Sequence, residues 1–166
     1  MNRRPLRLVV SPLCTSLECP ATRRDKAEVA DLNIIGHGID LVDIGEMRLW
    51  IEDPREPLAQ RCFVKEELEE VGEGSDRVER LAGKFAAKEA VLKALGTGFG
   101  AGVAFSDVII LRAAGTPPQV QLSGGAAKVA ANLGISHWKL SISHAGAIAI
   151  ASAIALGSNA HGELSD

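Results

Sequence analysis

The sequence predicts one α+β domain, in which strands and helices mix along the chain. An apolar stripe of period 3.6 runs through residues 77–95 and stops at Gly96, as in an amphipathic helix with a glycine cap. Alternation of period two in 34–42 and in 137–156 is typical of strands. With 166 residues and 46% hydrophobic content, the chain is long enough to enclose a single core.

The first half of this domain is expected to contain one strand and three helical segments. Asp43 followed by Glu46 gives the first helix a start that resembles a capping box. Prolines or polar residues mark the loop before each later helix. The expected order is strand 34–42, helix 43–52, loop 53–57, helical stretch 58–71, loop 72–76 and helix 77–95.

The second half is expected to be richer in strands. Its last segment contains many alanines, which favour a helix, but Ile148, Ile150 and Ile154 alternate with small residues, so period two prevails. The expected order is a glycine-rich loop 96–102, a strand near 105–112, a turn 115–118, a strand 119–122, a helix 125–133, and strands 137–144 and 147–156 joined by a turn at 145–146.

Residues 1–32 are expected to be an N-terminal extension, because they hold three prolines and two Arg-Arg pairs and show no lasting apolar period. The domain itself is expected to span 33–157, with a C-terminal tail over 158–166.

Composition and charge exclude several classes of protein. No apolar run reaches the ~18–20 residues of a membrane helix. The net charge of −3 offers no general attraction to nucleic acid, and an acidic partner would need a local basic patch. The chain has three cysteines, Cys14, Cys19 and Cys62, and this odd count indicates a reducing, cytoplasmic location. Too few ligands lie near Cys14 and Cys19 for a zinc site.

Three charges interrupt the apolar helix 77–95. Lys88 falls inside the stripe formed by Leu81, Phe85, Leu92 and Leu95, so its ammonium must reach water or find an anionic partner. Glu89 and Lys93 share the rim of that stripe, one turn apart. They are either an i,i+4 surface pair, worth about 0.2–0.5 kcal/mol, or part of a site for an anion or a metal.

Asp40 and His144 lie at the ends of two predicted strands. Asp40 shares a strand face with Gly36 and Gly38, where another backbone or a ligand can come close, and it has no capping role because Asp43 already fills it. His144 ends the strand 137–144, and a histidine in such a place is more often a satisfied core or edge residue than a functional one. Gly96 is interpreted first as a helix cap, and only second as a point where a nucleotide approaches.

Three motifs together resemble the holo-acyl-carrier-protein synthases, which are small phosphopantetheinyl transferases. The resemblance runs from about Asn33 to about Leu156. Its motifs are GHGID at 36–40, LAGKFAAKEA at 81–90 with KALGTG at 93–98, and LSISH at 140–144. It implies a 4'-phosphopantetheinyl transferase-like fold, with an antiparallel sheet packed against helices, and a homotrimer whose sites lie between subunits.

The resemblance also implies an activity, in which phosphopantetheine passes from coenzyme A to a serine of apo acyl carrier protein, with release of adenosine 3',5'-bisphosphate. Asp40 and Glu89 are the expected ligands of Mg²⁺, since oxygen-only ligands suit this ion. Asp40, Glu89 and Lys93 form the expected catalytic set, and the proton acceptor is either Glu89 or a metal-bound water. The expected coenzyme A contacts are Lys88, Lys93, Gly96, Gly98 and His144.

Four residues depart from the family pattern, namely Glu46, Thr116, Ala145 and Ile148. Glu46 replaces an arginine, so contact with the carrier protein is expected to fall on Arg48, Arg55 and Arg61. Two other functions are kept as alternatives. One is a non-catalytic paralogue that binds the carrier protein, and the other is a metal-dependent pyrophosphatase that cuts coenzyme A with water.

Overall fold

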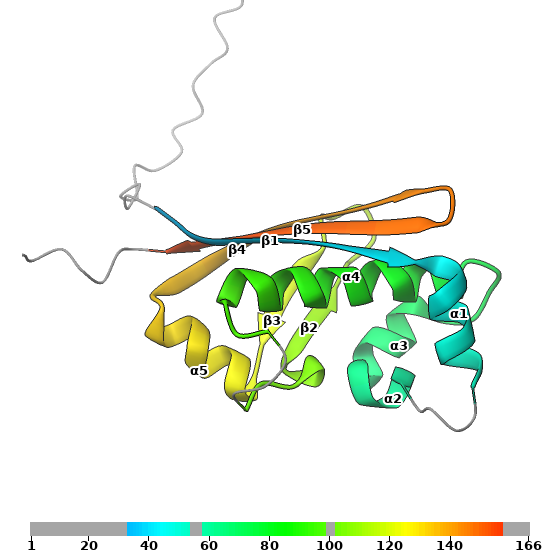
Figure 1. The fold of residues 1–166 in the computed structure, drawn as a ribbon, viewed down its shortest axis with the longest axis horizontal. Coiled ribbons are helices and arrows are strands. Elements are labelled where there is room, and N and C mark those ends of the chain that lie inside the picture. The colour runs from blue at the N-terminus through cyan, green and yellow to red at the C-terminus, as the bar shows by residue number, and fades with distance from the viewer. Residues whose placement is uncertain (1–32, 54–57, 99–101, 158–166) are drawn as a thin grey trace, which may run out of the picture.

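The computed structural model describes residues 33–53, 58–98 and 102–157. A three-stranded antiparallel sheet with the strand order β1-β5-β4 forms one layer of the fold (Figure 1). Its strands are β1 (Asn33–Asp43), β4 (Ile135–Ala145) and β5 (Ile148–Gly157). The strand assigned to the alanine-rich last segment is therefore confirmed.

Helix α4 (Arg77–Leu95) lies along one face of this sheet, and its bounds agree with the prediction. The residues of β5 that face it are Ala149, Ala151, Ala153 and Ala155, each at most 1% exposed. Small side chains let a helix approach a sheet closely, so the period-two alanines of β5 have a packing role. No helix in the described part of the chain is long and apolar enough to cross a membrane.

The other side of α4 is covered by shorter elements (Figure 1). A separate two-stranded antiparallel sheet contributes to this layer. The elements outside the main sheet and α4 are α1 (Ile44–Glu52), α2 (Leu58–Cys62), α3 (Lys65–Val71), β2 (Val108–Leu111), β3 (Gln119–Leu122) and α5 (Gly124–Asn132). The α+β class with an antiparallel sheet packed against helices is thus confirmed.

The bounds of two predicted elements were wrong, although the helices and the strand are present. The helical stretch 58–71 is broken, because Val64 adopts an extended conformation and starts α3, with its backbone N–H donating to Glu67 Oε2 at 3.0 Å. The strand near 105–112 begins instead with a 3₁₀ turn at Phe105–Asp107. In β1, the pairing with β5 shifts between Ile34 and Gly36, and Ile34 is exposed; strict alternation over 34–42 would place it on the same strand face as Gly36 and Asp40.

Both predicted helix caps are confirmed. Asp43 Oδ1 accepts the backbone N–H of Glu46 at 2.9 Å and so caps the start of α1. Gly96 ends α4 in the left-handed conformation, with φ of 71°, which a residue without a side chain adopts at little cost.

Candidate active site

The site is built where β1 meets α4, and two glycines make that contact possible. A Cβ atom added to Gly36 would lie 2.0 Å from the carbonyl oxygen of Ala94, and one added to Gly38 would lie 2.0 Å from that of Ala90. The predicted close approach at these glycines is therefore made by the backbone of α4. It brings Asp40, the next residue on the same strand face, beside the end of α4.

Asp40 forms an ion pair with Lys93 on α4. Lys93 Nζ donates to Asp40 Oδ1 at 2.7 Å and to the carbonyl oxygen of Ile39 at 3.0 Å. The Lys93 side chain is 49% exposed and that of Asp40 is 16% exposed. An ion pair this open to water contributes about 0–1 kcal/mol to stability, so Lys93 can exchange its partner for a ligand at low cost.

Glu89 completes a cluster of three charged groups with Asp40 and Lys93. Burial raises the pKa of Glu89, the negative charge of Asp40 raises it further, and the positive charge of Lys93 opposes both. The two carboxylates are thus close enough to repel each other. Sequence reasoning placed all three residues at one site, and the structure brings them together.

This pair of carboxylates fits a hard divalent cation. In the described residues no group of three or more His, Cys, Asp or Glu side chains could hold a metal ion by itself. Mg²⁺ commonly binds through one or two carboxylates and takes its remaining ligands from water and substrate phosphates. Two carboxylates beside an exchangeable lysine match that pattern.

Lys88 is fully buried, and of the two predicted outcomes for its ammonium the structure shows the anionic partner, which is a protein carboxylate. Its Nζ lies 2.8 Å from Glu67 Oε2 on α3, and both side chains are 0% exposed. It also donates to the carbonyl oxygens of Val108 and Phe105, and it lies 5.5 Å from the centre of the Phe63 ring. Burial lowers the pKa of Lys88, and Glu67 opposes that shift.

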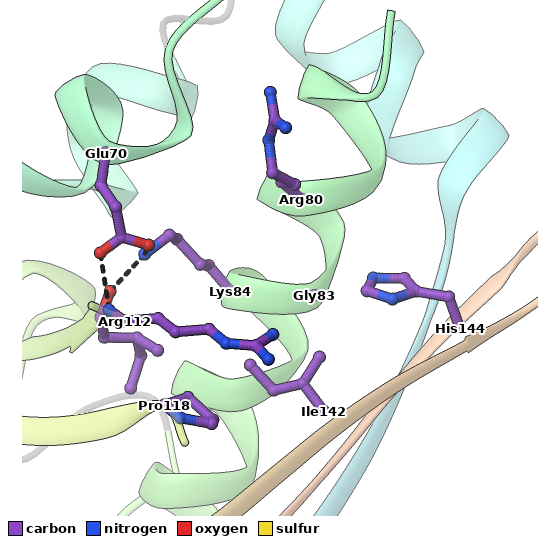
Figure 2. Close-up of a pocket in the computed structure, with 9 residues that line it drawn as sticks. Glu70, Arg80, Gly83, Lys84, Arg112, Pro118, Ile142 and His144 are labelled. Carbon is purple, nitrogen blue, oxygen red and sulfur yellow. Dashed lines mark hydrogen bonds and ion pairs between the residues drawn. The ribbon is translucent and has the colours of Figure 1, made fainter. Parts of the chain in front are cut away.

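A cavity of about 140 Å³ lies beside the first half of α4 (Figure 2). Its wall carries Arg80, Lys84, Arg112 and His144, with one carboxylate, Glu70. In the described part of the chain, Arg80 Nε is buried without a hydrogen-bond partner. A wall with four cationic or imidazole side chains and one carboxylate suits an anionic ligand.

His144 reaches this cavity from β4, as Figure 2 shows. Its Nε2 donates to the carbonyl oxygen of Glu79 at 3.1 Å. A Cβ atom added to Gly83 would lie 2.8 Å from this Nε2, so the glycine makes room for the imidazole against α4. The sequence analysis identified His144 as a candidate but missed Lys84. The spacing offered a signal, because Lys84 lies four residues before Lys88 and therefore on the same helix face.

The cavity and the carboxylate cluster lie on different faces of α4. Lys84 and Lys88 contact the backbone of β2, whereas Lys93 contacts β1. Along the helix, Lys84 and Lys93 are about 13 Å apart at 1.5 Å per residue. The charged groups of one copy thus form two separate regions.

The remaining predicted residues lie on the surface. Gly98, like Gly96, has a positive φ and open space where a side chain would be. Arg61 is exposed, and Arg48 pairs with Glu52 across one helical turn at 3.5 Å. Arg55, residues 99–101 of the glycine-rich loop, and both predicted terminal segments lie outside the described residues.

Comparison with known proteins gives consistent matches. A family model described as the 4'-phosphopantetheinyl transferase superfamily matches residues 36–151. A holo-[acyl-carrier-protein] synthase of Hydrogenovibrio crunogenus is 40% identical over 122 residues, which cover 74% of this chain and 96% of that protein. The crystal structure of the holo-[acyl-carrier-protein] synthase from Neisseria meningitidis has a TM-score of 0.67 at 32% identity, covering 74% of this chain and 98% of that one. The synthase of Helicobacter pylori, solved in complex with coenzyme A, has a TM-score of 0.63 at 28% identity, covering 72% and 98%.

Proposed function

The chain belongs to the 4'-phosphopantetheinyl transferase superfamily and, within it, to the holo-[acyl-carrier-protein] synthases, and from that premise we propose a reaction for its charged cluster. It is a phosphopantetheinyl transferase that modifies an acyl carrier protein. We assign the transfer to Asp40, Glu89 and Lys93, with coenzyme A as donor and a carrier serine as acceptor. The observation that carries this assignment is the meeting of these three side chains where β1 packs on α4.

The reaction is an in-line displacement at phosphorus. The serine oxygen forms a bond to the phosphorus that carries pantetheine, the bond from that phosphorus to the bridging oxygen breaks, and adenosine 3',5'-bisphosphate leaves. Lys93 neutralises negative charge on the phosphates after exchanging Asp40 for them. Glu89, which lies in the same cluster as Lys93 and Asp40, is the proposed acceptor of the serine hydroxyl proton.

Mg²⁺ is the proposed cofactor, held by Asp40 and Glu89. Its charge would offset that of the pyrophosphate of coenzyme A. Repulsion between the two carboxylates, which raises the pKa of Glu89, supports this role, because a cation between them would relieve it.

The coenzyme A contacts are proposed at Gly96, Gly98 and Lys93 in one region and at His144 and Lys84 in the other. In the described residues, the hydroxyl of Thr97 between the two glycines is buried without a partner, which favours a polar ligand there. Lys88 is left out of this set, because protein groups surround its ammonium.

We propose a homotrimer, as the family resemblance implies. The separation of these two regions supports an oligomer, because the cavity of a neighbouring copy could then lie beside the carboxylate cluster of the first. The outer face of the sheet is the proposed interface, since no described element covers it in Figure 1. Ile39 and Leu41 are 46% and 60% exposed on this face, and Leu41 pairs with Ile150 of β5. Light scattering after gel filtration should give three times the chain mass, and Leu41→Lys should lower it, while a monomeric parent would refute the trimer.

Helix α1 is the proposed contact for the carrier protein. Arg48 offers a positive charge, and the neighbouring Leu49 and Trp50 are exposed apolar side chains. An acidic carrier helix would meet both kinds of group, and Arg61 lies exposed on α2.

Mass spectrometry of an apo carrier protein incubated with this chain, coenzyme A and Mg²⁺ tests the function. Addition of one phosphopantetheine to the carrier and appearance of adenosine 3',5'-bisphosphate are expected, and chelation of the metal should stop both. Free phosphopantetheine with unmodified carrier would instead indicate a pyrophosphatase. No change in either substrate would indicate a non-catalytic binding protein. Asp40→Asn serves as the inactive control.

A further inference from the structure

Strand β2 has one edge that no strand covers in the described part of the chain. It pairs with β3 only, through a register that includes Val108 with Leu122 and Ile110 with Val120. Side chains meet the other edge instead. Lys88 donates to the carbonyl oxygen of Val108, and Ile110 N–H donates to Glu67 Oε1 at 2.9 Å. Lys84 donates to the carbonyl oxygen of Ile110, and Arg112 N–H donates to Glu70 Oε2 at 2.7 Å.

Glu67, Lys88, Glu70 and Lys84 form two ion pairs along this edge. In each pair the glutamate accepts a backbone N–H and the lysine donates to a backbone carbonyl oxygen. The inner pair is Glu67 with Lys88, at 2.8 Å and 0% exposed on both sides. The outer pair is Glu70 with Lys84, at 2.9 Å, with side chains 28% and 7% exposed. Only the outer pair borders the cavity, as Figure 2 shows. The inner pair is closed to ligands, whereas the outer pair faces any anion that enters.

Lys84 is only partly engaged by its protein partners. An ammonium has three donors, and Glu70 and the Ile110 carbonyl oxygen take two of them. The third donor is left for a ligand. Any phosphate bound there also lies near the negative charge of Glu70, which weakens its binding through Coulomb repulsion.

We propose that Glu70 is a specificity-determining residue that limits the affinity of this cavity for phosphate groups. This inference rests on the proposed function, in which Lys84 and His144 of the cavity contact coenzyme A, and it takes the group bound there to be a phosphate that remains on adenosine 3',5'-bisphosphate after the transfer. Binding energy common to substrate and product lowers KM without raising kcat, and tight product binding slows release. Glu70 keeps the cavity from holding the product.

Glu70→Gln tests this role in the full-length chain. Calorimetry should show adenosine 3',5'-bisphosphate and inorganic phosphate binding on the order of tenfold more tightly. In the transfer assay, KM for coenzyme A should fall and kcat should fall with it. A merely structural residue would weaken binding when replaced, so unchanged or weaker binding overturns the proposal.

Glu69→Gln is the matched control. Glu69 is on the same helix and pairs with Lys65 at the surface, so the variant removes the same charge away from the cavity and should bind like the parent. Equal tightening in this variant would also overturn the proposal. Glu70→Met is a second variant that removes the charge. If the glutamine side chain of Glu70→Gln disturbed folding, the methionine variant would still show whether loss of the charge tightens binding. Lys84→Gln combined with Glu70→Gln should abolish the gain.

The binding measurements separate this inference from the proposed function. Adenosine 3',5'-bisphosphate binds without any carrier protein, so tighter binding in Glu70→Gln supports the role of Glu70 even if no transfer is detected. Transfer activity together with unchanged binding would overturn the role of Glu70 alone.

Discussion

Two of the lysine–carboxylate pairs on helix α4 have nearly equal length and opposite exposure. The Glu67–Lys88 pair spans 2.8 Å and is closed to solvent, whereas the Asp40–Lys93 pair spans 2.7 Å and is open to it. Breaking a buried pair leaves an uncompensated charge at a cost of about 3–5 kcal/mol, while an exposed pair contributes about 0–1 kcal/mol. The same kind of pair therefore stabilises the core in the first region, and in the second it leaves Lys93 open to the ligand that the proposed reaction requires.

The difference comes from the elements that cover each lysine. Lys88 faces α3, the 3₁₀ turn Phe105–Asp107 and β2. These elements supply one carboxylate and two carbonyl oxygens and exclude water. Lys93 sits in the last turn of α4, where β1 supplies one carboxylate and one carbonyl oxygen and leaves one side open. Four predictions test this contrast.

The largest effect is expected at the core pair. Glu67→Gln leaves the Lys88 ammonium buried without a counter-charge, so the free energy of unfolding should fall by about 3–5 kcal/mol. Urea denaturation measures this. Glu67→Gln combined with Lys88→Met should recover much of the loss, because no charge then remains buried. A loss below about 1 kcal/mol in the single variant would mean that water reaches this pair.

Lys93→Ala should show the opposite behaviour. Its unfolding free energy should stay within about 0.5 kcal/mol of the parent. Its transfer rate at saturating coenzyme A should drop by about 10²–10³, because a positive charge near the reacting phosphates is lost. Lys65→Ala removes another exposed, paired lysine and should keep both stability and rate. If Lys93→Ala turned over as fast as the parent, Lys93 would have no catalytic role and would only form a surface ion pair.

Gly38→Ala should affect both properties at once. The new methyl group would lie 2.0 Å from the Ala90 carbonyl oxygen, so β1 must shift away from α4. Overpacking of this kind typically costs about 1–3 kcal/mol. Because Asp40 moves with β1, the rate should fall as well, by up to about 10²-fold for a shift near 1 Å. Gly45→Ala, whose methyl group meets only the Asp43 side chain, is the control.

The smallest effect concerns Cys62, which lies in the core near Lys88. Burial raises the pKa of the Cys62 thiol, and the positive charge of Lys88 opposes this. A raised pKa leaves less thiolate near pH 8, so alkylation should be slow and should speed up as pH rises. Peptide mass spectrometry after timed alkylation measures this residue separately. Glu67→Gln should accelerate the labelling if the core pair keeps this region closed, and equal rates would argue against it.

Local patterns in the sequence determined much of the fold and part of the site. The bounds of α4, the strand assignment of the alanine-rich β5 and the caps at Asp43 and Gly96 all follow from short-range periodicity and backbone preference. The two glycines of β1 indicated a close approach beside Asp40, and the motifs identified the family. These signals are local, so the sequence alone can show them.

Only the tertiary structure decided which groups face each other across the fold. Glu67 is 21 residues from Lys88, and Glu70 is 14 residues from Lys84, and no periodicity links residues on separate helices. The sequence required that the Lys88 ammonium reach water or find an anionic partner, but it did not say which, or whether that partner was a ligand or a glutamate. The packing of α3 and β2 onto α4 decides it, because burial and the satisfaction of buried polar groups depend on long-range contacts.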